Sequence, residues 1–291
     1  MVDFQLSTTE IPAEAGLKSA QARYRVWESN SDPTLRVVWD LSEAVRRRSL
    51  WVRLAWQDVL LRYRRSLLGP FWLTLSMGLM VAALGIIYGD IFKVDMNEYL
   101  PFLTVSLLVW NLMQSCIGEG CQTFIEAEWI IRQINLPLSM FPLRVVCRNI
   151  IIFLHNVVIY LLVVVVFQIE IRWSTLIAIP ALLLLLTNAL WCAMLLGMLS
   201  ARFRDLPQIV SSMLQIAFFA TPVIWRAEII NNKLLVLLNP FYHFIELVRA
   251  PLLGHAPPRL SWFVVGGITL IGGAATLSFY RFLGHRIPYW V

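Results

Sequence analysis

The stretch Val157-Val158-Ile159-Tyr160-Leu161-Leu162-Val163 is apolar at every position. Strands of a membrane β-barrel alternate polar and apolar residues over about ten positions. A segment that is apolar on all sides, with no polar face, is instead typical of a helix whose backbone groups are satisfied internally within lipid. We therefore predict that this stretch lies inside a membrane-spanning helix.

Six runs in the chain lack Asp, Glu, Lys and Arg and reach the length of about 20 residues that a helix needs to cross a hydrocarbon core about 30 Å thick. They cover 66–89, 99–118, 149–169, 173–201, 206–225 and 260–280. The composition agrees, because 58% of the 291 residues are hydrophobic and only 14% are charged, against about 25% charged in soluble domains. We predict an all-α membrane protein with six transmembrane helices.

The segment between the fifth and sixth runs has a different character. Residues 234–245 are uncharged but too few to cross a bilayer, and Asn239-Pro240 interrupts them. Another short apolar piece, 250–253, follows Glu246 and Arg249. Backbone that enters a membrane and returns is tolerated where protein buries it or where it lines a wet cavity. We predict a re-entrant helical pair here.

The distribution of Lys and Arg predicts the orientation. If the amino terminus is cytoplasmic, 18 of the 24 basic residues fall on the cytoplasmic side and six on the other. Cytoplasmic loops of membrane proteins carry such an excess. Both termini of a multi-pass protein are therefore expected in the cytoplasm, and the same pattern argues against nucleic-acid binding.

Three regions follow along the chain. Residues 1–33 are polar and lack periodicity, which indicates a mobile tail. In residues 34–69, Val52, Trp56 and Leu60 recur at helical spacing, which predicts an amphipathic helix at the cytoplasmic membrane interface. Residues 70–291 form the transmembrane domain.

Motifs for catalysis and for ATP hydrolysis are missing from the sequence. It contains no Gly-Lys dipeptide, which the phosphate-binding loop of a Walker-type motor requires. The four cysteines lack C-x-x-C spacing, so we expect no metal site. Glu119, Glu126 and Glu128 are interpreted as a solvated helix end, and His155 is the sole ionisable residue within the runs. These observations favour a permease whose driving force comes from another chain.

Several motifs occur in an order that is similar to a known family. They are 62–72 (RYRRSLLGPFW), 99–102 (YLPF), 109–111 (VWN), 130–137 (IIRQINLP), 238–242 (LNPFY) and 286–291 (RIPYWV). In this order the chain resembles ABC-2 type permeases that export bacterial polysaccharides such as O-antigen, capsule and teichoic acid. Residues 70–291 would then be the ABC-2 type transmembrane domain.

The resemblance implies a homodimer bound to two copies of a cytoplasmic ATP-binding-cassette ATPase. ATP and Mg would bind that ATPase, and this chain would need no cofactor of its own. The assembly would move an undecaprenyl-diphosphate-linked polysaccharide across the bacterial inner membrane. A helix that couples the permease to the ATPase is expected in 126–137, and a plain connector is the alternative. The predicted coupling residues are Glu126, Glu128, Ile130, Arg132 and Asn135.

Two sets of residues are candidates for contact with a lipid-linked glycan. The diphosphate would bind Arg62, Arg64 and Arg65, whose alternative role is positive-inside anchoring. Sugar rings would pass over aromatic side chains, which otherwise form lipid-facing belts. These aromatic candidates are Phe71, Trp72, Trp110, Phe218, Phe219 and Trp225. An ABC-2 permease for a drug or lipid, and a membrane-bound glycan-modifying enzyme, remain the alternative functions.

Overall fold

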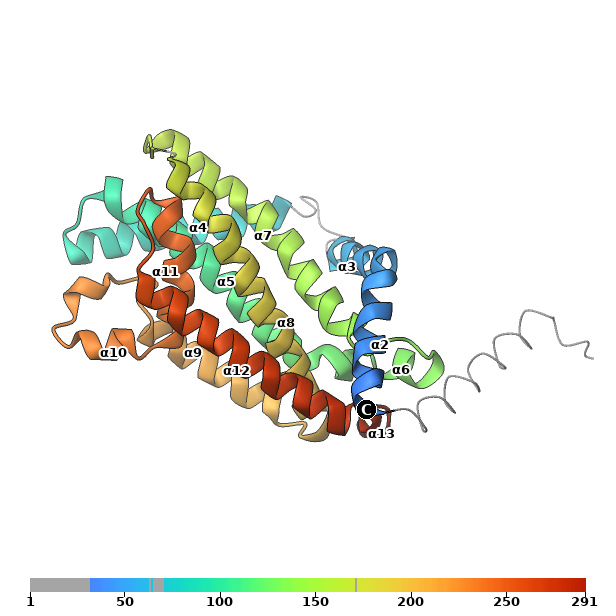
Figure 1. The fold of residues 1–291 in the computed structure, drawn as a ribbon. Coiled ribbons are helices and arrows are strands. Elements are labelled where there is room, and N and C mark those ends of the chain that lie inside the picture. The colour runs from blue at the N-terminus through green and yellow to red at the C-terminus, as the bar shows by residue number, and fades with distance from the viewer. Residues whose placement is uncertain (1–31, 63, 65–70, 171) are drawn as a thin grey trace, which may run out of the picture.

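The computed structural model describes residues 32–62, 64, 71–170 and 172–291. Within these ranges all regular structure is helical (Figure 1). Of the predicted tail 1–33, all but the last two residues lie outside the described ranges. The prediction of an all-α protein is therefore confirmed for the described part of the chain.

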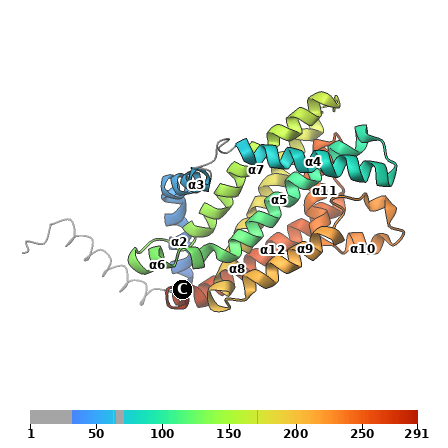
Figure 2. The same cartoon turned by 180° about the vertical axis from the view of Figure 1, so that it is seen from behind.

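Five helices in the described ranges are long and apolar enough to cross a membrane. They are α4 (Phe71–Phe92), α5 (Met96–Glu126), α7 (Met140–Val166), α8 (Ala178–Arg202) and α12 (Arg259–Leu283). α5 is the most buried of them and lies among the others, while α8 and α12 run side by side (Figures 1 and 2). With 31 residues, α5 is about 46 Å long and extends well beyond the predicted run 99–118.

The fifth predicted run, 206–225, does not form one continuous helix. It begins with α9 (Leu206–Ala220), whose 15 residues span about 22 Å and fall short of a bilayer core. Pro222 disfavours helical geometry at Thr221, so the helix ends before it. The segment after α9 is buried and irregular, and the Tyr99 hydroxyl donates to the Ile224 carbonyl over 2.7 Å.

Two short helices follow the irregular segment after a 3-10 turn, η2 (Ala227–Ile229): α10 (Lys233–Leu237) and α11 (Pro240–Leu252). Asn239 and Pro240, which interrupt the apolar stretch 234–245 in the sequence, lie between α10 and α11, and α11 starts there. The Asn239 side chain accepts from the Phe241 amide over 2.9 Å, and proline suits the first helical position. The same asparagine donates to the Thr221 hydroxyl over 2.9 Å, so α11 is tied to the end of α9.

The region predicted as an interface helix forms two helices. α2 (Pro33–Arg46) and α3 (Arg48–Arg62) are separated at Arg47. α3 packs along α7, whereas α2 contacts α7 and α12 (Figure 2). Together they place a helical layer against one end of the apolar helices.

Asp40 joins α2 to the start of α7. Its side chain is buried, and its carboxylate accepts from the backbone amides of Leu138 at 2.7 Å and Ser139 at 3.0 Å. These amides lie just before the first turn of α7, where donors lack helical partners and a negative charge is favourable. Burial raises the pKa of the Asp40 carboxyl, and the hydrogen bonds from Ser139 and Leu138 oppose that shift.

We predict that Asp40→Asn lowers the free energy of unfolding by about 1–3 kcal/mol at neutral pH, since an amide cannot accept both bonds. Because the folded carboxyl has a raised pKa, protonation favours the fold, and the wild-type advantage should grow as pH falls through that pKa. Thermal melting of the two proteins in detergent at several pH values measures both effects. Glu43→Gln, whose partner is Arg47 directly after α2, is the control and should change stability by less than about 1 kcal/mol. Equal melting of Asp40→Asn and wild type would refute the capping role.

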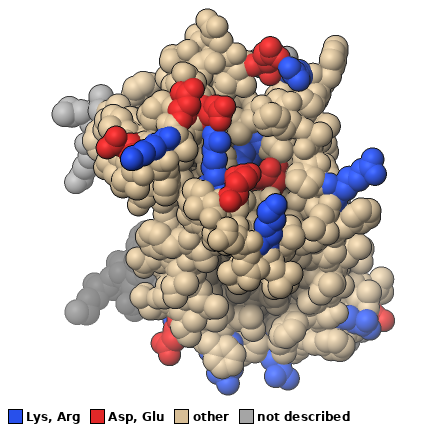
Figure 3. Space-filling view, turned by 90° about the vertical axis from the view of Figure 1, so that its left-hand side faces the viewer, with Lys and Arg blue, Asp and Glu red and all other residues tan. Residues whose placement is uncertain are grey.

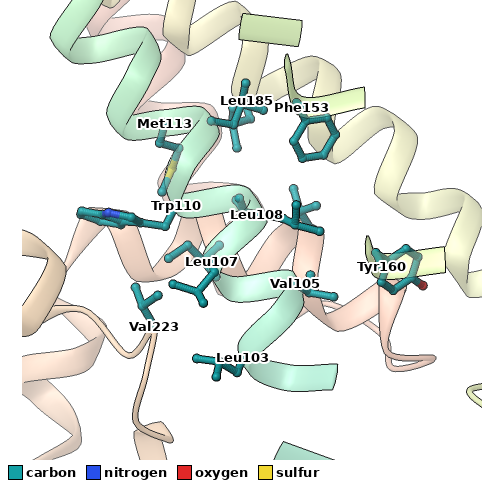
Figure 4. Close-up of a cluster of buried hydrophobic side chains, with 14 of the residues drawn as sticks. Leu103, Val105, Leu107, Leu108, Trp110, Met113, Phe153, Tyr160, Leu185 and Val223 are labelled. Carbon is teal, nitrogen blue, oxygen red and sulfur yellow. The ribbon is translucent and has the colours of Figure 1, made fainter. Parts of the chain in front are cut away.

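The main core surrounds α5. Figure 4 shows Leu103, Leu107 and Trp110 of α5 with Phe153 of α7 and Val223 after α9. All five are buried. The irregular segment after α9 is therefore part of the packed interior and is held in place by α5.

Candidate functional site

The basic side chains gather at one end of the bundle, here called the basic end, where α2, α3, the loop after α5 and the carboxyl terminus meet (Figure 1). The turn between α4 and α5, together with α10, forms the opposite end. Arginines at the basic end include Arg62, Arg132, Arg144, Arg148, Arg202 and Arg204. This separation follows the sequence-based division of the loops into two sides.

A network of charged side chains joins three helices at the basic end. Arg148 of α7, with a side chain only 9% exposed, donates to Glu119 of α5 at 2.8 Å and to Asp58 of α3 at 3.2 Å. Arg144, one turn earlier on α7, binds both oxygens of Asp58, at 2.5 and 2.7 Å. Arg62 of α3 donates to the other oxygen of Glu119 at 3.0 Å. The network therefore fixes α3 against the ends of α5 and α7.

The interpretation of Glu119 as a solvated helix end is wrong. α5 continues past Glu119 to Glu126. The Glu119 carboxylate also accepts a hydrogen bond from the Asn149 side chain over 2.7 Å. The sequence analysis missed Asp58, Arg144 and Arg148 as network members. The i,i+4 spacing of the two arginines, which puts them on one face of α7, was the available signal.

Of the three arginines predicted to bind a diphosphate, the structure describes Arg62 and Arg64. Arg62 is engaged with Glu119, Arg64 is exposed, and Arg65 lies outside the described residues. The network contains three arginines, Arg62 among them, and only two carboxylates, those of Asp58 and Glu119. The basic end thus keeps a net positive charge that can attract an anion.

A short helix, α6 (Glu128–Gln133), lies where the sequence predicts a coupling helix. Glu128 and Arg132 pair across one turn at 2.9 Å, and Glu128 lies 4.0 Å from Arg204 before α9. Arg132 donates to the Val291 carbonyl oxygen through Nε at 3.1 Å and also through Nη2. α6 is therefore anchored both to the loop between α8 and α9 and to the carboxyl terminus.

The outer surface of α6 remains open. Trp129 is 60% exposed, and Glu126, Arg132 and Asn135 are exposed as well. Large exposed aromatic side chains with charged neighbours are typical of protein interfaces. Of the predicted coupling residues, Glu128 and Ile130 are partly buried.

The predicted aromatic path does not appear as one surface. Trp110 is only 2% exposed, and its ring centroid lies 5.5 Å from those of Phe218 and Phe241. Its indole donates to Gln114 over 2.6 Å. These contacts favour a packing role for Trp110. The other predicted aromatics divide into three exposed residues, Phe71, Trp72 and Phe219, and two partly buried ones, Phe218 and Trp225.

A second charged cluster surrounds a cavity of about 510 Å³ at the opposite end, where Figure 3 shows acidic and basic side chains around a hollow. Arg249 of α11 is buried, pairs with Glu246, and donates to the Ser106 hydroxyl and the Pro222 carbonyl at 2.9 Å each. Its guanidinium also lies 4.3 Å from the centre of the Phe102 ring. Arg249, which the sequence places in the predicted re-entrant region, therefore fastens α11 to α5 and to the segment after α9.

No group of three metal-ligating side chains occurs among the described residues. The histidines near the core have structural partners: His155 Nδ1 is 2.8 Å from the Ile151 carbonyl, and His243 lies between Ser261 and the Leu237 carbonyl. The described geometry thus offers charged surfaces and cavities, and His155 and His243 serve the fold.

Comparison with known proteins gives matches over most of the chain. The family described as ABC-2 type transporter matches residues 49–253. An O-antigen export system permease protein, RfbA, of Myxococcus xanthus is 27% identical over 224 residues, which cover 74% of this chain and 85% of that protein. A protein of the same description from Klebsiella pneumoniae is 24% identical over 192 residues, covering 65% of this chain and 74% of that protein.

Proposed function

Because the chain belongs to the ABC-2 type transporter family, we propose that it is the permease subunit of an ATP-binding-cassette exporter for an O-antigen-like polysaccharide. The cargo would be linked to undecaprenyl diphosphate and would leave the cytoplasm across the bacterial inner membrane. The observation that carries the proposal is the match to permeases named for O-antigen export over as much as 74% of the chain.

The energy would come from a separate ATPase. In this proposal two permease chains pair with two ATPase subunits, which bind ATP and Mg, and both permease termini face the cytoplasm. The sequence supports the division of labour because it has no Gly-Lys dipeptide for a Walker loop. The exposed Trp129 and Glu126 on and beside α6 would contact the ATPase.

Six membrane passages are part of the proposal. The fifth passage would combine α9 with the irregular segment after it, which α5 holds through Tyr99 and Ile224. α10 and α11 would then form the re-entrant pair, and α2 and α3 would lie along the cytoplasmic interface. The position of α2 and α3 at the basic end supports this arrangement.

Coupling would operate by movement of packed helices. α6 is anchored through Glu128 and Arg132 to neighbouring segments, and the Asp58–Arg148–Glu119 network joins α3 to α5 and α7. A displacement imposed by the ATPase would therefore pass to several helices as a rigid-body shift. Arg62 and Arg64 would meet the diphosphate of the substrate near the basic end.

Deletion of the gene for this chain in its host tests the proposed function. Cell-surface polysaccharide should disappear and lipid-linked polysaccharide should accumulate inside the cell, with both effects reversed by the gene on a plasmid. Unchanged amounts of polysaccharide at the surface, with no internal accumulation, would exclude this cargo.

A further inference from the structure

A pocket of about 260 Å³ lies between α4, α5 and α7, and its lining reaches Arg62 of the charged network at the basic end. α4 crosses α5 and α7 in this part of the bundle (Figure 2). Amide and hydroxyl side chains supply its polar lining: Ser76, Asn111, Ser115, Asn149 and Asn156. The Phe153 ring from α7 adds an apolar surface (Figure 4).

Asn156 is the observation that points to a ligand. The residue is only 8% exposed, and its Oδ1 atom is buried with no hydrogen-bond partner among the described residues. A buried polar atom without a partner costs free energy, so native proteins usually supply such an atom with one. A hydroxyl group would satisfy the amide whichever of its two polar atoms faces the pocket, because a hydroxyl both donates and accepts.

The other asparagines in the lining also offer acceptors. Asn149 uses its amide nitrogen to donate to Glu119 and to the Val145 carbonyl. Asn111 uses its amide nitrogen to donate to the Leu107 carbonyl at 3.0 Å. Their carbonyl oxygens are therefore what these two side chains can present to a ligand.

Charge disfavours two other kinds of ligand beside the asparagines. Their carbonyl acceptors repel the oxygens of a phosphate, and Arg62, the one basic residue among the described lining residues, shares its charge with Glu119. The described lining residues include no carboxylate and one arginine, Arg62, so they do not favour a metal cation. A neutral molecule with several hydroxyl groups and a flat apolar face matches both the acceptors and the Phe153 ring.

We propose that this pocket binds one sugar ring of the exported glycan, whose hydroxyl groups donate to the side-chain carbonyls of Asn111, Asn149 and Asn156. The pocket is smaller than the sites of about 300–1,000 Å³ that hold drug-sized molecules, and this size limits it to about one ring. The inference rests on the proposed function and adds a specific glycan contact inside the membrane domain.

The test compares two buried asparagines. Asn188 on α8 is also buried, but its amide donates to the Leu184 carbonyl and the Thr269 hydroxyl and accepts from Trp191. Surface glycan is measured per folded permease in a gene-deleted host, together with thermal melting of each purified variant. Asn156→Leu should reduce export about two- to tenfold, the effect of about one hydrogen bond, without lowering the melting temperature. Asn188→Leu should lower the melting temperature and leave export per folded molecule unchanged.

Asn111 lines the pocket from α5. A second variant, Asn111→Leu, should therefore also reduce export about two- to tenfold. Export by Asn156→Leu equal to that of wild type would overturn the sugar site, and a pocket that holds only water gives this result. An Asn156→Leu protein that melts as early as Asn188→Leu would also overturn it, because Asn156 would then be a structural residue. If the wild-type gene itself fails to restore surface glycan, the proposed function falls instead.

Discussion

Replacing Arg148 by Met should lower the free energy of unfolding by about 3–5 kcal/mol, the cost of removing one partner from a buried ion pair. The Arg148 side chain is 9% exposed and serves two carboxylates, Asp58 and Glu119, on different helices. Without it these carboxylates keep only Arg144, Arg62 and the Asn149 amide as partners. Thermal melting of the purified protein in detergent measures the loss.

Two further variants sharpen this prediction. Arg204→Met removes an arginine whose contact with Glu128 is longer, 4.0 Å, and far more exposed, so it should cost about 1 kcal/mol or less. Adding Glu119→Gln to Arg148→Met removes one of the stranded charges and should restore part of the stability. Arg148→Met melting at the temperature of Arg204→Met would show that the network does not hold the helices together.

Replacing Trp129 by Ala should weaken binding of the ATPase about 30-fold or more, as expected for a central aromatic interface residue worth about 2 kcal/mol or more. Trp129 is 60% exposed on α6, so its removal should leave the fold intact. Co-purification of the ATPase with the permease measures binding, and the melting temperature of the permease reports on the fold.

The matched control for Trp129 is Trp173, which is 88% exposed in the 3-10 segment η1 (Trp173–Ile177) before α8. η1 lies at the opposite end from α6, so Trp173→Ala should leave ATPase binding unchanged. Equal recovery of the ATPase with both variants would remove α6 as the docking element.

The helical architecture could be predicted because long apolar runs without charges are stable in a bilayer as helices. The stretch around Val157–Val163 lies within α7, and the short helix α6 formed within the predicted loop 126–137. These features depend on local sequence alone, and helix formation follows from them directly.

Features set by packing could not be predicted. α9 ends at Ala220, and the residues after it are fixed by Tyr99 and Arg249, which lie far from them in sequence. The pairing of Glu119 with Arg148 likewise depends on how α5 and α7 meet. Trp110 illustrates the same limit, since an aromatic residue near a membrane surface and one in a core have the same local sequence pattern.

In the proposed function this chain is a gate opened by ATP hydrolysis on another protein. Purified permease is reconstituted into liposomes, and purified lipid-linked glycan is added outside them. Three samples are compared: the permease alone, the permease with the ATPase, and the permease with an ATPase variant that binds ATP but does not hydrolyse it. Glycan protected inside the liposomes should accumulate only with the active ATPase and ATP. Sustained accumulation by the permease alone, or with the inactive ATPase, would contradict it.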